Sequence, residues 1–128
     1  MRYHLDTDFL IYALSQSGPE RKRLAQVVSS EAEIQISAIA WYEFARGPRT
    51  PEQLAVARDL FGEHGVVPFS EELAMASAET FRSLGSPRKR AADVGIGVTA
   101  GAMGATLLTR YADDFAGIPR VKVEGVAE

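Results

Sequence analysis

The sequence predicts an α/β fold with a short, mostly parallel central sheet surrounded by helices. Short apolar segments with strand character alternate with helical segments along the whole chain, and Gly or Pro residues stand at many of the junctions. Strands that are separated by helices pair in parallel through right-handed crossovers. The length of 128 residues, with 46% hydrophobic and 24% charged residues, fits one globular domain spanning residues 1–128.

The first half of the chain contains five expected elements. The hydroxyl of Thr7 can cap the first helix, and Pro19 suits the first turn of the second. The pair Gly47-Pro48 ends the third helix. In chain order we expect a strand at 3–5, helices at 8–14 and 19–29, a strand at 34–36 and a helix at 38–46.

The second half continues the same alternation. Pro51 starts a helix and Ser70 caps another. Three glycines lie in the helix expected at 90–103 and a fourth, Gly104, follows it directly, and a glycine within a helix costs about 1 kcal/mol relative to alanine. Either this helix packs closely against a neighbour, or its glycine face leaves room for a substrate backbone. The expected elements are helices at 51–61, 71–84 and 90–103, and strands at 66–69, 106–108 and 121–123.

Composition and motifs exclude several function classes. The chain has no cysteine, so disulfides, thiolate zinc sites and cysteine nucleophiles are ruled out. It has no nucleophile elbow, phosphate-binding loop or dinucleotide fingerprint. The longest uncharged apolar stretch, 94–108, is shorter than the ~20 residues that a membrane span needs. We therefore expect a cytoplasmic protein that does not enter membranes.

A few acidic residues lie in unusual surroundings. Asp6 ends a strand, Glu43 lies among aromatic residues, and Asp93 is in an almost wholly apolar segment. Asp113 and Asp114 follow the strand at 106–108. Ligands of open parallel sheets gather at the carboxyl ends of the strands, and carboxylates that converge there repel one another unless a divalent cation is present. Mg²⁺ prefers such oxygen ligands and suits phosphodiester hydrolysis.

The alternative is that single salt bridges neutralise the buried acids. Arg46 is the nearest basic residue to Glu43, and Arg90 precedes Asp93 by three residues. An ion pair of this kind would make each acid a structural residue.

The ordered motifs resemble those of the PIN-domain ribonucleases, and more closely the VapC-type toxins of bacterial toxin–antitoxin pairs. The spacing is 37 residues from Asp6 to Glu43, 50 from Glu43 to Asp93 and 21 from Asp93 to Asp114. The matching segments are Leu5-Asp6-Thr7-Asp8, the run from Ser37 to Gly47, Ala92-Asp93-Val94-Gly95-Ile96, and the stretch from Leu107 to the ending Asp114-Phe115-Ala116-Gly117-Ile118-Pro119.

The resemblance implies a three-layer α/β/α sandwich and a Mg²⁺- or Mn²⁺-dependent endoribonuclease that cleaves tRNA or rRNA to inhibit translation. It also implies a cognate antitoxin, and a homodimer or a toxin–antitoxin hetero-oligomer. By position, Asp6 and Asp93 are the metal ligands, and Glu43 either binds through water or orients the attacking water. Asp114 completes the catalytic set, and Thr7 and Thr109 orient the carboxylates.

The sequence departs from the family pattern at Tyr111, where many relatives carry Asn or Asp. This difference leaves open whether Asp114 or Asp113 fills the fourth position, or whether that position is vacant.

Local positive charge is needed for RNA, because phosphate contacts dominate nucleic-acid affinity and the net charge is −3. The segment 20–23 is expected to be only a solvated helix face, and a solvated helix entry is the alternative for 88–90. The candidate RNA-binding residues are Arg46, Arg88, Lys89, Arg90 and Arg110.

Three other expectations concern rival functions and a partner. A receiver-type signalling domain also places acids at strand ends, but here no lysine follows the strand at 106–108 until Lys122. A PIN-like domain without activity would serve as a scaffold. The apolar residues Trp41, Phe44, Leu54 and Phe61 either form a groove for an antitoxin tail or belong to the core.

Overall fold

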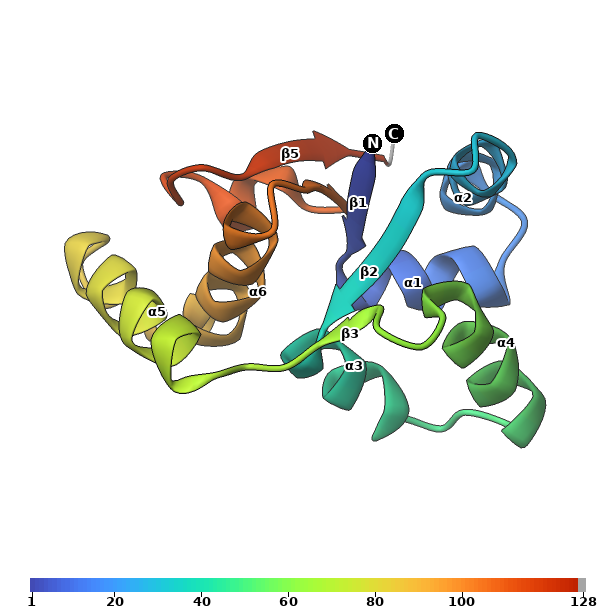
Figure 1. The fold of residues 1–128 in the computed structure, drawn as a ribbon, viewed down its shortest axis with the longest axis horizontal. Coiled ribbons are helices and arrows are strands. Elements are labelled where there is room, and N and C mark those ends of the chain that lie inside the picture. Colours follow the sequence, from blue (N-terminus) through green and yellow to red (C-terminus); the bar gives the residue numbers. More distant parts are fainter. Residues whose placement is uncertain (127–128) are drawn as a thin grey trace.

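The computed structural model describes residues 1–126, and its elements follow the predicted order (Figure 1). The last two residues of the predicted domain, 127 and 128, lie outside the described part. The strands are β1 (Arg2–Leu5), β2 (Glu33–Ser37), β3 (Val66–Val67), β4 (Thr106–Thr109) and β5 (Lys122–Gly125). The helices are α1 (Thr7–Ser15), α2 (Pro19–Ser29), α3 (Ala38–Ala45), α4 (Pro51–Phe61), α5 (Glu71–Ser83) and α6 (Ala91–Ala102), with 3₁₀ turns η1 (Arg88–Arg90) and η2 (Ala112–Phe115).

The strands form one parallel sheet in the order β3-β2-β1-β4-β5. The central strand β1 therefore lies between β2 and β4, where His4 is in register with Gln35 and Leu107. In receiver domains the first strand lies between the second and third instead. The parallel sheet is confirmed, and the receiver alternative is excluded.

Helices cover the sheet on both sides, as expected for a three-layer α/β/α sandwich. In Figure 1, α5 and α6 lie on one side, and α1, α2 and α4 lie on the other, with α3 at the carboxyl end of β2. The buried core extends from β1 and β4 into α1 and α6, and its largest side chains include Phe9, Phe44, Phe115, Leu5, Leu10, Ile36, Ile96, Leu107 and Leu108.

Three details differ from the sequence prediction. The N-cap of α1 is Asp6, whose carboxylate accepts from the backbone N–H of Thr7, so Thr7 is the first helical residue. Strand β3 is only two residues long because Pro68, which follows it, has no N–H to continue the ladder. Val28 is exposed, although it follows the apolar spacing of α2.

The glycines of α6 pack closely against neighbouring side chains. A Cβ atom on Gly97 would lie 2.7 Å from Cδ1 of Ile118, and one on Gly95 would lie 2.5 Å from Cδ1 of Ile39. The close-packing interpretation of this helix is confirmed.

The aromatic residues of α3 and α4 form part of the core. Phe44 and Phe61 are buried, and the ring of Trp41 stacks on Phe44 with 5.8 Å between centroids. The alternative in which these side chains belong to the core is therefore confirmed for Phe44 and Phe61. No helix within residues 1–126 combines the length and apolarity needed to cross a membrane.

Candidate active site

Four of the predicted acidic residues line one hollow at the carboxyl ends of the strands. Asp6 follows β1, Glu43 lies on α3, Asp93 lies in the first turn of α6, and Asp114 lies in η2 after β4. The hollow has a volume of about 270 Å³. Of the two neighbouring aspartates, Asp114 lines the hollow and Asp113 does not.

Two threonines hold the acids in place. The backbone N–H of Thr7 donates to Oδ1 of Asp6 at 2.8 Å, and the hydroxyl of Thr109 donates to Oδ2 at 2.8 Å. The hydroxyl of Thr7 donates to Oε1 of Glu43 at 2.7 Å. These bonds orient one oxygen of Glu43 and both oxygens of Asp6, which is the arrangement expected for the two threonines.

Burial and mutual repulsion disfavour ionisation of two of these acids. Burial raises the pKa of Asp6 to about 6, and the charges of Asp8 and Glu43 add to the rise. The two hydrogen bonds that Asp6 accepts lower its pKa by less than burial raises it. The pKa of Asp93 is raised to about 7, first by burial and then by the charges of Asp6, Asp114 and Glu43. The acids therefore share one electrostatic environment.

Within residues 1–126, no basic side chain forms an ion pair with an acid of the hollow, and the charge of Arg90 lowers the pKa of Asp93 by less than burial and the neighbouring acids raise it. Within residues 1–126, the ion pairs join Arg2 to Glu33, Arg23 to Glu124, Arg110 to Glu20 and His64 to Glu63. None of them includes an acid of the hollow. The salt-bridge alternative for Glu43 and Asp93 is thus wrong.

The donor set fits a divalent cation that is held by few direct ligands. In the described part of the chain, no three side chains of Asp, Glu or His are placed to hold a metal ion together. Mg²⁺ characteristically uses one or two carboxylates and keeps several waters. Asp6 and Asp93 could supply these two carboxylates. A cation between them would relieve the repulsion that helps to raise the pKa of Asp93.

The predicted basic residues fall into different environments. Arg46 is exposed and lines the hollow, with its guanidinium 5.4 Å from the centre of the Tyr42 ring. Arg88 and Lys89 are exposed on η1. Arg90 instead donates from Nε to the carbonyl of Asp114 at 2.7 Å and from Nη2 to the carbonyl of Ala116 at 2.9 Å. Its guanidinium therefore ties down the segment that carries Asp114.

Arg110 is engaged within the protein. Its Nε donates to Oε2 of Glu20 at 2.9 Å, and its guanidinium carbon lies 3.6 Å from the centre of the Tyr12 ring. Glu20 is only 3% exposed, so the expectation that it belongs to a solvated helix face is wrong. A direct contact of Arg110 with RNA would have to disrupt this arrangement.

Sequence reasoning missed three residues of the hollow, Asp8, Ile11 and Tyr111. Asp8 lines it from the first turn of α1, and its proximity to Asp6 in the chain was a usable signal. Tyr111 also lines it, although the sequence marked this residue only as a departure from a family pattern.

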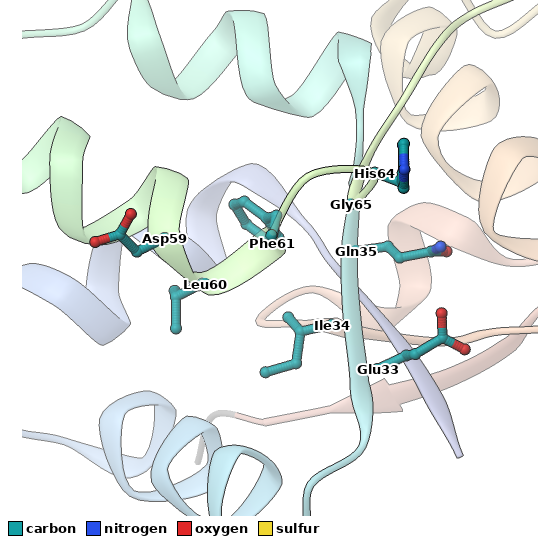
Figure 2. A pocket seen from close by; sticks show the side chains of 9 residues that line it. Glu33, Ile34, Gln35, Asp59, Leu60, Phe61, His64 and Gly65 are labelled. Atoms are coloured by element: carbon teal, nitrogen blue, oxygen red, sulfur yellow. The ribbon is translucent and has the colours of Figure 1, made fainter.

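A second hollow of about 340 Å³ lies away from these acids, beside β2 and the end of α4 (Figure 2). Figure 2 shows Ile34 and Phe61 to one side of β2 and Gln35 to the other. Gln35 forms a hydrogen bond of 2.8 Å with the buried His4. None of the predicted site residues lines this hollow.

Comparison with known proteins adds the following. A family model, that of the PIN domain, matches residues 3–121. No curated protein is similar enough to count as a match. The fold is similar to that of a chain in the crystal structure of VapBC2 from Rickettsia felis bound to a DNA fragment from their promoter, with 21% identity, a TM-score of 0.75, and coverage of 99% of this chain and 100% of that one.

Two further solved structures are similar at higher sequence identity. One is a toxin–antitoxin complex from Klebsiella pneumoniae, with 26% identity, a TM-score of 0.70 and coverage of 93% of this chain and 94% of that one. The other is FitAcB from Neisseria gonorrhoeae, with 26% identity, a TM-score of 0.68 and coverage of 94% and 95%.

Proposed function

The chain belongs to the PIN domain family, and from this premise we propose that it is a metal-dependent endoribonuclease that hydrolyses phosphodiester bonds in RNA. One observation carries the proposal. Four carboxylates from four separate segments line one hollow, and none of them is paired with a basic side chain in residues 1–126. Such a cluster is costly unless it holds a cation.

Asp6 and Asp93 would hold the ion, which we propose to be Mg²⁺ with Mn²⁺ as a substitute. The bound ion supplies positive charge that offsets the carboxylates and the phosphate undergoing hydrolysis. The hydrogen bonds from Thr7 and Thr109 keep Asp6 in one orientation before the ion enters. Asp114 adds a fourth negative charge, on the segment that Arg90 ties down.

Glu43 would act on the attacking water. Its Oε1 accepts from Thr7, which leaves Oε2 free to accept a hydrogen bond from water and then its proton. Arg46, the basic residue that lines the hollow, would contact a phosphate of the RNA. Arg88 and Lys89 would add phosphate contacts at the entry to α6.

We further propose that the protein is the toxin of a toxin–antitoxin pair, which acts in the cytoplasm on tRNA or rRNA and thereby inhibits translation. The support is the similarity to a chain in the toxin–antitoxin complex from Klebsiella pneumoniae, at 26% identity over more than nine tenths of both chains. A cognate antitoxin would be its partner, and the active form would be a homodimer or a hetero-oligomer with that antitoxin.

The test is cleavage of total RNA by the purified protein. We expect new 5′ ends in Mg²⁺, none after EDTA, and none from Asp93→Asn. Sequencing these ends would identify the RNA and the cut site. Folded protein that leaves RNA intact in both Mg²⁺ and Mn²⁺ would favour the alternative of an inactive PIN-like scaffold.

A further inference from the structure

A large aromatic side chain lies exposed at the edge of the acidic hollow. Tyr111 is 46% exposed and lines the hollow together with the four predicted acids. It comes directly before η2, so it lies between the end of β4 and the segment that carries Asp114. Because much of its ring faces solvent, core packing does not account for an aromatic residue here.

The Tyr111 ring is fixed at both ends. Its backbone N–H donates to the hydroxyl oxygen of Thr109 at 3.1 Å, and the same hydroxyl donates to Asp6. At the other end, the phenolic oxygen accepts from Nη1 of Arg110 at 3.0 Å. Arg110 is itself held by the buried Glu20 and by the ring of Tyr12. The ring is thus held in a defined position relative to Asp6.

The charge of the hollow makes such a ring useful to a nuclease. Its lining contains five acidic residues and a single basic residue, Arg46. Phosphate contacts alone therefore give little attraction close to the acids. Stacking of a base on an aromatic side chain contributes roughly 1–3 kcal/mol per base, and it requires a base that is unpaired and accessible.

We propose that the exposed part of the Tyr111 ring is a stacking surface for an unpaired nucleobase next to the phosphate that is cleaved. Tyr111 is then a substrate-positioning residue. This inference deepens the proposed ribonuclease function and rests on it.

The test compares two probes that differ only in their bases. One is a labelled oligoadenosine decamer, and the other is an abasic ribose-phosphate decamer with the same number of phosphates. Binding is measured by fluorescence anisotropy at low ionic strength in Mg²⁺, in an Asp6→Asn background that prevents cleavage. We expect Tyr111→Ala to weaken binding of oligoadenosine by roughly 5- to 100-fold, the size of one lost stacking contact, and to leave the abasic decamer within about twofold.

Two variants separate stacking from local structure. Tyr111→Phe keeps the ring and loses the hydroxyl, and it should bind oligoadenosine within about threefold of the background protein. Tyr42→Ala removes another exposed tyrosine, one that does not line the hollow; because its ring lies beside Arg46, any effect should be the same for both probes. Because both probes are measured on the same sample, partly misfolded protein lowers both signals and leaves their ratio intact.

The outcomes distinguish this inference from the function on which it rests. The role of Tyr111 would be overturned if Tyr111→Ala weakened both decamers equally or weakened neither. It would also be overturned if Tyr42→Ala caused the same selective loss of oligoadenosine binding. If the parent protein cleaves RNA in Mg²⁺ while one of these results holds, the ribonuclease function stands. Absence of both cleavage by the parent and binding of either probe would instead overturn the proposed function.

Discussion

Replacing Asp6 with asparagine separates a catalytic role for this residue from a structural one. The substitution keeps the shape of the side chain and removes one charge from the cluster. Asparagine is also as good an N-cap as aspartate, so the bond to the Thr7 N–H that begins α1 is retained. The amide can in turn donate to the hydroxyl oxygen of Thr109. Loss of charge is therefore the main consequence.

The raised pKa of Asp6 gives the expected size of the effect. Its pKa moves from 3.8 to about 6 on folding, so the folded state binds the proton more tightly than the unfolded state. Stability therefore falls as the pH rises between these two values, by about 3 kcal/mol for a single site. Above pH 7 the ionised Asp6 carries this full cost. We expect Asp6→Asn in EDTA at pH 7.5 to be about 1–3 kcal/mol more stable than the parent.

The assay is urea unfolding in EDTA at pH 7.5 and at pH 5, together with RNA cleavage in Mg²⁺. The gain in stability should be largest at pH 7.5 and shrink at pH 5, where the parent carries a protonated Asp6. Cleavage should be abolished. Asp113→Asn, which removes a neighbouring charge outside the hollow, serves as the control and should change neither quantity.

A less stable Asp6→Asn protein at pH 7.5 would refute this reasoning, because it would mean that the carboxylate has a stabilising partner in the folded state. So would cleavage at the parental rate.

Four further predictions concern the metal and the arginines. Millimolar Mg²⁺ should raise the melting temperature by several degrees at pH 8 and by less at pH 5.5. The reason is that Asp93, with a pKa of about 7, must lose its proton to bind the ion, so Asp93→Asn should abolish the shift. Arg90→Ala should weaken Mg²⁺ binding and cost about 1–2 kcal/mol in urea unfolding, because two backbone carbonyls lose their donor, whereas Arg88→Ala should leave both unchanged. Arg110→Ala should lower the free energy of unfolding by about 3–5 kcal/mol, because it leaves the buried Glu20 unpaired. Arg46→Ala should leave the stability unchanged and should reduce, by about one, the slope of the logarithm of RNA affinity against the logarithm of salt concentration.

Much of the fold could be predicted because local signals and the sheet topology agree. Helix α2 has its predicted bounds, since Pro19 fits the first turn and Leu24 and Val27 face the core. Strand β3 was predicted too long because its apolar pattern continues through Phe69, while the backbone of Pro68 cannot pair. The pattern of apolar residues predicts which face of a strand is buried, whereas the length of the strand depends on whether each backbone N–H has a hydrogen-bond partner.

The acids of the hollow were predictable for a related reason. A carboxylate in an apolar segment is costly wherever it lies, so Asp6 and Asp93 were conspicuous in the sequence. Because ligands gather at the carboxyl ends of parallel strands, the two residues could be predicted to lie close together there. Asp8 was missed because an acid in the first turn of a helix is favoured by the helix dipole and needs no further explanation.

The arginines could not be assigned from the sequence, because a guanidinium reaches several residues from its own backbone and its partner is set by the fold. Arg110 pairs with Glu20, 90 residues away in the chain, and Arg90 donates to a carbonyl 24 residues away. Both lie next to site acids in the sequence, which made them candidates for binding phosphate. In the folded chain, their charge fixes Tyr111 and the Asp114 segment around the hollow. Positive charge beside an acidic site can therefore organise the site as well as attract a substrate, and only the donor–acceptor contacts distinguish the two roles.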